Sequence, residues 1–327
     1  VYNSHTQQFP YYSNQLAWMY NMRKYLLHVL IISFVFLLAP TAHVASYAGS
    51  LEDAKEEVRN NPDDASTHYN LGGAYIKSGK WKEAIESYKQ VLRIDPDHAD
   101  AHFYLGCIYD ELGKYQEAIE SFKQAIRIDP VEAVAHFNLG YAYGELGKYE
   151  EAIESYKQVI RIVPDFADAH TNLGNAYNES GKWEEAREAW QQAIRIEPYF
   201  AMAHNNLGCT YNKTGKHKKA IESYKKAISI NPDDAEVHYN LGVAYAELGK
   251  NEEAIESFRQ AIRLDPDYAY AHYNLGIAYG ELGRHEEAIE SYKQAIRIDP
   301  DDADAHFNLG LAYGKSGRYE EAIESYR

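Results

Sequence analysis

The chain has 327 residues, with 33 Lys and Arg against 49 Asp and Glu, which gives a formal charge of −16. Apolar residues make up 45% and charged residues 25%, a balance that is typical of globular proteins and excludes a mainly disordered chain. This acidity argues against nucleic acid as a partner, because affinity for phosphates needs a surplus of Lys and Arg. Two cysteines are too few for a disulfide framework or a four-cysteine zinc site.

Residues 1–48 contain no acidic residue, and their only charged residues are Arg23 and Lys24. An apolar run over 25–39 follows this basic start, and a stretch of small residues then ends at Ala48. This order is that of a secretory signal peptide over 22–48, which predicts an exported, periplasmic or secreted protein of bacterial type.

The apolar run is shorter than the roughly 20 residues that span a bilayer, which favours cleavage after Ala48. The alternative is an uncleaved inner-membrane anchor, in which residues 25–39 are the only contact with the membrane. Residues 1–21 lie upstream of the signal and are interpreted as a misassigned or untranslated leader.

The rest of the chain repeats one pattern of 34 residues. Proline recurs at this spacing from Pro62 to Pro300, and Leu-Gly does so from Leu71 to Leu309. Counting positions from the Ala that follows the proline step, we predict eight repeats, at 65–98, 99–132, 133–166, 167–200, 201–234, 235–268, 269–302 and 303–327, the last of them truncated. The residues from 49 on carry 31 basic and 49 acidic side chains, a formal charge of −18.

Each repeat predicts two helices, because its apolar residues recur at spacings of 3, 4 and 7 in both halves. Glycine at position 15 suits the left-handed residue that ends a helix, and proline at position 32 ends the second helix. The Asp residues after this proline are expected to cap the next first helix. Glycine at position 8 falls inside the first helix, which predicts a close approach that a Cβ would block. Tyrosine at position 11 and the aromatic residue at position 24 are expected to form the core.

A 34-residue helix–turn–helix with Leu-Gly, Tyr, Ala, aromatic, Ala and Pro at these offsets resembles the tetratricopeptide repeat (TPR). The resemblance covers 65–327 and implies an all-α fold, a right-handed superhelical solenoid of eight stacked helix-turn-helix repeats whose first helices line a concave groove. Residues 49–64 are expected to form an N-terminal capping helix. The sequence reaches Arg327 within a helix without a matching cap, so we interpret the chain as a piece of a longer protein.

Histidine occupies position 4 of every repeat, where the family often has Trp. One imidazole per repeat, about 10 Å from the next, cannot assemble a zinc site, so we expect packing and no metal. The column is His68, His102, His136, His170, His204, His238, His272 and His306. The same spacing places Cys107 and Cys209 too far apart for a disulfide.

No pattern in the repeats indicates a catalytic residue or a cofactor, and we expect the chain to have neither. The Glu-rich runs of the second helices are interpreted as solvated faces with Lys partners at i,i+4.

Positions 2, 6, 9 and 13 lie on one stripe of the first helix, with position 5 beside it. The family binds peptides on this surface. Positions 2 and 13, together with Asp110, carry ten acids against three lysines, so the groove is expected to be acidic and aromatic and to prefer basic, aromatic segments; the alternative is ordinary surface charge. The candidate groove residues at positions 2, 5 and 13 are Asp100, Asp168, Glu236, Asp304, Phe137, Tyr239, Tyr273, Phe307, Glu145, Glu179, Glu247 and Glu281.

Asparagine occupies position 6 in seven repeats, although it is a middling helix former. An amide matches the donors and acceptor of a peptide group, so this column is expected to hold an extended peptide without reading its sequence. The alternative is that each amide bonds a neighbouring helix and holds the stack. The column is Asn70, Asn138, Asn172, Asn206, Asn240, Asn274 and Asn308, with Tyr104 in the remaining repeat.

Two further surface patterns bear on partners. Chaperone-binding members of the family use Lys or Arg at positions 2, 5 and 6; here these positions are not basic, which excludes acidic C-terminal tails of that kind as partners. The repeat at 201–234 is locally basic, with Lys213, Lys216, Lys218, Lys219, Lys225 and Lys226, and is either a second contact site or neutral variation on a solvated face.

These patterns predict a non-catalytic scaffold that binds extended peptide or protein partners in the groove. One alternative is a substrate-recruiting array of a larger exported or membrane-anchored enzyme with its catalytic domain beyond Arg327, since arrays of this kind resemble that of O-linked N-acetylglucosamine transferase. Another is a membrane-tethered assembly factor.

Overall fold

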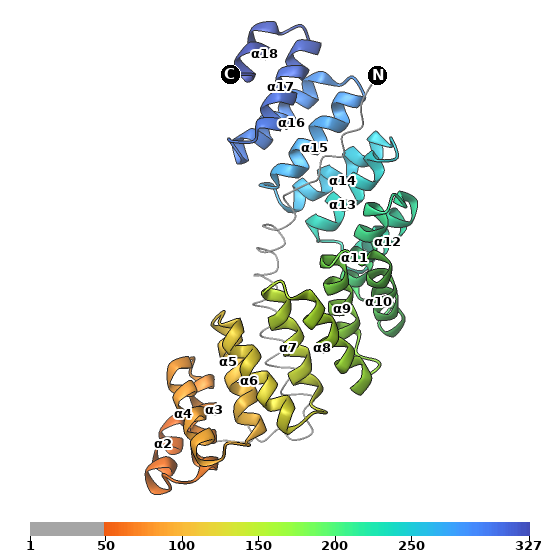
Figure 1. Ribbon diagram of the computed structural model, residues 1–327. Coiled ribbons are helices and arrows are strands. Elements are labelled where there is room, and N and C mark those ends of the chain that lie inside the picture. The colour runs from red at the N-terminus through yellow and green to blue at the C-terminus, as the bar shows by residue number, and fades with distance from the viewer. Residues whose placement is uncertain (1–48) are drawn as a thin grey trace. The chain divides into compact units, whose positions relative to one another are not determined.

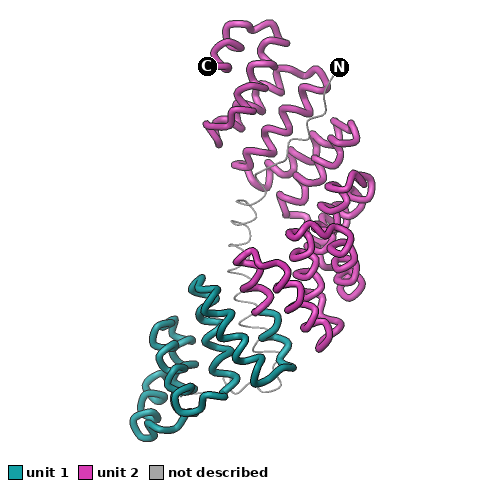
Figure 2. The backbone as a smooth tube through the Cα atoms, viewed as in Figure 1, with its two compact units in different colours: residues 1–138 teal, residues 139–327 magenta. Residues whose placement is uncertain are grey.

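A computed structural model describes residues 49–327, so the signal peptide predicted over 22–48 and the leader over 1–21 lie outside the described residues. The described residues form seventeen helices and no strand (Figure 1). They divide into two compact units, one ending at residue 138 and the other over residues 139–327, which Figure 2 shows in teal and magenta. The predicted all-α class with eight repeated helix pairs is confirmed.

The first helices of the eight repeats have nearly equal lengths. They are α3 (Ala65–Lys77), α5 (Ala99–Glu111), α7 (Ala133–Glu145), α9 (Ala167–Glu179), α11 (Ala201–Lys213), α13 (Ala235–Ala246), α15 (Ala269–Glu281) and α17 (Ala303–Lys315). The second helices are α4 (Trp81–Ile94), α6 (Tyr115–Ile128), α8 (Tyr149–Ile162), α10 (Trp183–Ile196), α12 (His217–Ile230), α14 (Asn251–Leu264), α16 (His285–Ile298) and α18 (Tyr319–Ser325). One helix precedes them, α2 (Leu51–Asn60), and packs Ala54 against Leu71 and Ala74 of α3.

The turn within each repeat depends on the glycine at position 15. All eight of these glycines have φ between 67° and 79°, a left-handed conformation that costs other residues about 1–2 kcal/mol, and no other residue from 49 on has a positive φ. The following residue then bonds back across the turn, as Lys250 N does to Tyr245 O at 3.0 Å. The predicted helix-ending role of position 15 is therefore confirmed.

The predicted caps of the first helices are present in only some repeats. Asp64, Asp234 and Asp302 accept hydrogen bonds from backbone N–H groups in the first turn, whereas the imidazole of His98 does so in α5. Phe166, Phe200 and Tyr268 stand at the same point without a side-chain cap.

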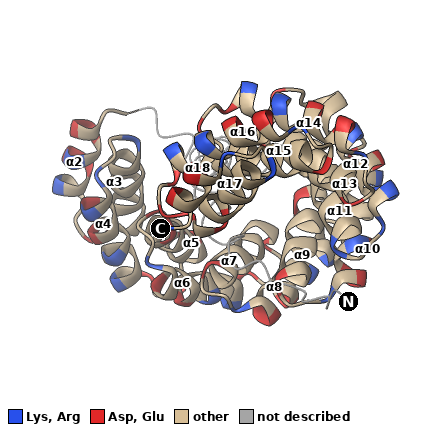
Figure 3. Cartoon of the chain, turned by 90° about the horizontal axis from the view of Figure 1, so that it is seen from above, with Lys and Arg blue, Asp and Glu red and all other residues tan. Residues whose placement is uncertain are grey.

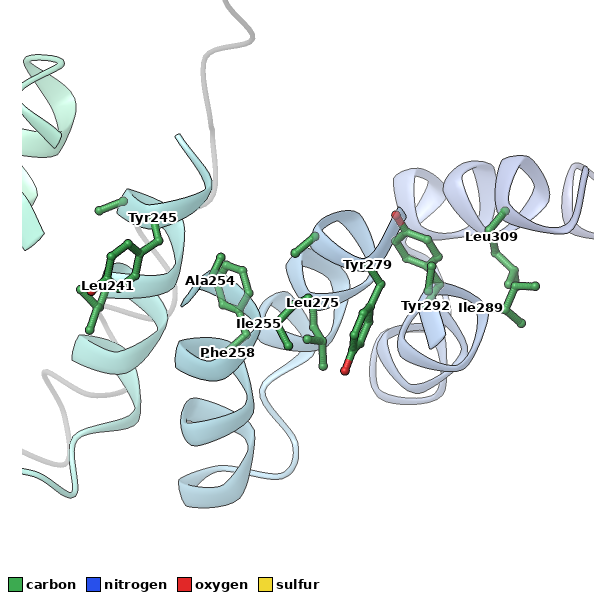
Figure 4. Packing of buried hydrophobic residues seen from close by; sticks show 14 of the residues in the cluster. Leu241, Tyr245, Ala254, Ile255, Phe258, Leu275, Tyr279, Ile289, Tyr292 and Leu309 are labelled. Carbon is green, nitrogen blue, oxygen red and sulfur yellow. The ribbon is translucent and has the colours of Figure 1, made fainter. Parts of the chain in front are cut away.

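The core forms where the first and second helix of a repeat meet. The aromatic side chain at position 24 lies against the position-8 glycine, and a Cβ added to that glycine would lie 2.4–2.9 Å from the nearest ring atom in every repeat. Such contacts are closer than van der Waals packing allows, so the predicted close approach is confirmed. Figure 4 shows two of these rings, Phe258 and Tyr292, among the buried hydrophobic side chains around them; they are 1% and 5% exposed.

The tyrosine at position 11 lies between cations, an arrangement that sequence reasoning missed. The Tyr279 ring centroid is 4.6 Å from the guanidinium carbon of Arg284 in its own repeat and 5.7 Å from that of Arg259 in the preceding repeat. Tyr245 and Tyr313 are flanked in the same way. Each such pair contributes about 0.5–1 kcal/mol at an exposed site and joins successive repeats. A signal was available, because positions 16 and 25 are basic in nearly all repeats.

Among residues 49–327, no helix combines the length and the apolar character needed to cross a membrane.

Candidate functional site

The predicted groove residues lie along one face of each first helix, which we call the first-helix stripe (positions 2, 6, 9 and 13). Positions 2 and 13 are three turns and about 16 Å apart, so in α9 and α13 a carboxylate marks each end of this face and the asparagine lies between them. Asp100, Asp168 and Asp304 are exposed, as are Glu179, Glu247 and Glu281, whereas Glu236 and Glu145 are half-buried.

The position-6 amides bond to the preceding repeat. Asn206 Nδ2 donates to Asn175 Oδ1 at 2.9 Å, and Asn308 Nδ2 donates to the Tyr273 hydroxyl at 2.9 Å. The Nδ2 group of Asn138 donates to Cys107 Sγ at 3.7 Å, and that of Asn274 donates to the Tyr239 hydroxyl at 3.1 Å. The Nδ2 group of Asn240 donates to both Asn205 Oδ1 at 3.3 Å and Cys209 Sγ at 3.7 Å. The acceptors occupy positions 5 and 9 of the preceding repeat, so one amide donor joins neighbouring first helices.

The acceptor end of the same amides is unused within the repeats. Across residues 49–327, none of the seven Oδ1 atoms accepts a hydrogen bond, and none counts among the buried polar atoms without a partner. The side-chain amides of Asn70 and Asn172 make no hydrogen bond within this range, and both residues are half-buried. The column therefore offers one carbonyl oxygen without an internal partner in each of seven repeats, although Asn240 is only 8% exposed.

The position-5 aromatics contribute more to packing than to an open surface. Phe137 is buried, and Tyr239 and Tyr273 are half-buried with hydroxyls that accept from the next repeat. Tyr273 packs on Tyr292 with ring centroids 5.9 Å apart, and burial raises the pKa of its hydroxyl. Phe307, in the last repeat, is 55% exposed. Among the predicted aromatic groove residues, Phe307 thus presents the largest open ring.

The histidine column serves the turn that precedes each first helix. Every one of its eight Nε2 atoms lies 2.8–3.1 Å from the carbonyl oxygen of the proline six residues earlier. The Nε2–H group donates to that oxygen and holds the proline turn against the helix. Within residues 49–327, no three His, Cys, Asp or Glu side chains gather as metal ligands do.

This hydrogen bond is a target for mutation. We expect His238→Phe to keep the flat ring but lose the bond to Pro232, with a cost of about 1 kcal/mol in the free energy of unfolding. His238→Gln, whose Nε2 is also a donor, should recover part of that loss. Urea unfolding followed by circular dichroism measures both, and equal stability of the three proteins would contradict the assigned role.

The two cysteines are free. Burial raises the pKa of the Cys209 thiol to about 11, and burial together with Asp110 raises that of Cys107 further. Both thiols are therefore protonated near neutral pH, and they accept from Asn240 and Asn138 rather than acting as nucleophiles.

Ion pairs on the second helices differ in spacing from the prediction. The pairs within a helix join residues three apart, as between Glu154 and Lys157 at 2.9 Å and between Glu290 and Lys293 at 3.1 Å, rather than four apart. Their carboxylates are exposed, so each pair contributes little to stability.

Comparison with known proteins agrees with this architecture. A model described as TPR repeat matches residues 145–179, 174–215, 208–249, 244–283 and 279–317, and models described as tetratricopeptide repeat match 63–130 and 121–154. No curated protein matches the chain.

Several solved structures are similar over part of the chain. A crystal structure of MamA is 33% identical over 47% of this chain and 90% of its own, with a TM-score of 0.46. YrrB, a TPR protein with an unusual peptide-binding site, is 27% identical over 57% of this chain and 96% of its own, with a TM-score of 0.50. The APC/C hetero-tetramer Cut9–Hcn1 is 20% identical over 80% of this chain and 52% of its own; its TM-score of 0.56 reflects a shared fold. On the repeated helix pairs and the family models together, the chain belongs to the tetratricopeptide repeat family.

Proposed function

We propose that this protein is an exported, non-catalytic scaffold that binds extended segments of partner proteins along the first-helix stripe. The observation that carries this proposal is the column of position-6 amides, whose Oδ1 atoms accept no hydrogen bond within residues 49–327. The similarity to YrrB, which has a peptide-binding site, supports a partner of this class.

The amide column suits an extended main chain. Where Nδ2 donates to the preceding repeat, that bond holds the amide in place and leaves its Oδ1 without an internal partner. Successive repeats are about 10 Å apart and an extended chain advances about 3.3 Å per residue, so one Oδ1 meets about every third backbone N–H. Recognition of this kind contacts the main chain of the partner and is therefore largely independent of the partner's sequence.

The carboxylates of the stripe add a preference for charge. Exposed acids at both ends of the first helices attract Lys and Arg side chains, and such attraction mainly raises the association rate and weakens with salt. Basic segments with aromatic residues are therefore the proposed partners.

Export is part of the proposal and rests on the order of residues 22–48. The protein is then periplasmic or secreted if the segment is cleaved, and anchored by residues 25–39 in the inner membrane if it is not.

Charge removal on the stripe tests the partner class. The probe is a fluorescein-labelled peptide of four Lys-Tyr-Ser repeats, which places a lysine at every third residue. We expect Asp168→Asn/Glu179→Gln/Glu236→Gln to weaken its binding at least tenfold at 0.1 M salt and to reduce the salt dependence, as measured by fluorescence anisotropy.

The matched control removes three carboxylates from exposed positions of second helices, in Glu185→Gln/Glu188→Gln/Glu256→Gln. This variant should bind within about twofold of the wild type. Equal losses in the two variants would mean that the overall charge attracts the probe, and would contradict a site on the first helices.

A further inference from the structure

Helix α12 is the most basic of the second helices, with four lysines and one glutamate, whereas each of the others has at most one more basic than acidic residue. Its exposed face holds Lys218, Lys219, Lys225 and Lys226, with Glu222 as the acid among them. We call these four lysines the α12 basic face. Figure 3 colours the charged residues along α12 and its neighbours.

Comparison with the other repeats shows which residues stand at the positions where α12 has lysine. Position 19 is glutamate in the seven other repeats and lysine only here, and position 26 is glutamine wherever else it occurs. As a result, α12 is the one second helix among the described residues with no acid in its first turn. Lysines at a helix N-terminus oppose the helix dipole, so Lys218 and Lys219 are placed at a cost to helix stability. Binding supplies a reason for a change that the helix itself disfavours.

The lysine-rich surface continues across the turn before α12. Lys213 Nζ lies 4.9 Å from the ring centroid of Trp183, which is 38% exposed, and Lys219 Nζ lies 5.7 Å from that of Tyr211. Contacts with aromatic rings hold these ammonium groups in place without cancelling their charge. Lys216 has an acid nearby, with Nζ 3.8 Å from Glu184 Oε1.

We propose that the α12 basic face docks an acidic segment of a partner protein. The lysines of this face span nine residues, about 12 Å along the helix, which matches carboxylates three to four residues apart in an extended chain. The face is one helix wide. The neighbouring second helices, about 10 Å away, present Glu184, Glu185 and Glu188 on α10 and Glu252, Glu253 and Glu256 on α14, all exposed. These acids repel a broad anionic surface such as a bilayer or a nucleic acid duplex, but leave room for a single narrow segment.

The chain then has two sites of opposite charge preference. The first-helix stripe attracts basic segments, and the α12 basic face attracts acidic ones. A scaffold with both sites holds two chemically different partners at once. This second site does not rest on the first, because the two involve different helix faces and different side chains.

A variant that restores the pattern of the other repeats tests the site. Lys218→Glu/Lys219→Glu/Lys226→Gln gives α12 the residues that α14 and α16 carry at these positions, so it should fold with an unchanged or higher melting temperature. The probe is a labelled peptide of four Glu-Ser-Ser repeats, compared with its Gln-Ser-Ser counterpart. We expect the wild type to bind the Glu peptide at least tenfold more tightly than the variant binds it. The wild type should also bind the Glu peptide at least tenfold more tightly than it binds the Gln peptide.

The control makes the same change of formal charge at exposed arginines elsewhere, in Arg161→Glu/Arg263→Glu/Arg297→Gln, and should bind the Glu peptide nearly as the wild type does. Equal binding by the wild type and the α12 variant would overturn the proposal. So would lysine-dependent binding to phosphatidylglycerol vesicles without binding to the Glu peptide. The α12 variant should bind the Lys-Tyr-Ser peptide as tightly as the wild type or more tightly. Failure of the α12 proposal can then be told apart from failure of the site on the first-helix stripe.

Discussion

Alanine in place of Gly276 should lower the free energy of unfolding by about 2 kcal/mol, whereas alanine in place of Gly280, one turn later in α15, should raise it by up to about 1 kcal/mol. A Cβ at Gly276 would lie 2.6 Å from Cε1 of Tyr292, and that ring is buried and cannot move aside. A Cβ at Gly280 would meet nothing within 4 Å, so only the better helix propensity of alanine remains. The two substitutions thus make the same chemical change in one helix with opposite results.

Urea unfolding of the two variants measures this difference. Because the substitutions share a helix, differences in the unfolded chain largely cancel between them. Destabilisation of both by the same amount would contradict the steric explanation and would point to a general intolerance of α15.

Truncation of Phe258 to alanine should be the most damaging single change, with a loss of about 3–5 kcal/mol. The ring is 1% exposed and lies against Gly242, where an added Cβ would come within 2.6 Å of it, and its centroid is 5.8 Å from that of Tyr239. Removal leaves a cavity between the helices of one repeat, which its neighbours cannot close without shifting the stack.

The same column provides the control for this truncation. Tyr326 occupies position 24 of the last repeat and is 50% exposed, so Tyr326→Ala should cost well under half as much. Unfolding by urea, followed by circular dichroism, compares the two. Similar losses would show that the position-24 ring stabilises its own repeat without needing burial.

Much of the fold follows from residues that act within one repeat. The glycine at position 15, the proline at position 32 and the apolar spacing are local signals, and the helices begin and end where these signals place them. The close contact at position 8 was also predictable. Glycine inside a helix lowers the stability of that helix, so its presence in every repeat indicates that a neighbouring group occupies the space that a Cβ would fill.

Contacts between repeats were harder to predict. The bond from Asn206 to Asn175 depends on how far one first helix slides along the next, which no spacing within a single repeat determines. The same holds for the contact of Tyr279 with Arg259 of the preceding repeat. By contrast, the bond from each histidine to the proline six residues earlier lies within one turn, and the constant offset between the two columns was a usable signal.

The asparagine column combines a structural role with a binding role. Asn240 and Asn308 use a donor to join neighbouring repeats, as the structural interpretation expects, and still keep an acceptor that a peptide can use. A substitution at these positions therefore changes stability and binding together, which makes them poor tests of either role alone.

Asn172→Ala is the variant that separates the two roles, because the side-chain amide of Asn172 makes no hydrogen bond within residues 49–327. The decisive measurement is the affinity of this variant for the Lys-Tyr-Ser peptide, taken beside its melting temperature. The proposed function predicts roughly fivefold weaker binding, as expected for the loss of about 1 kcal/mol from one hydrogen bond, with an unchanged or slightly higher melting temperature. A lower melting temperature with unchanged affinity would contradict it.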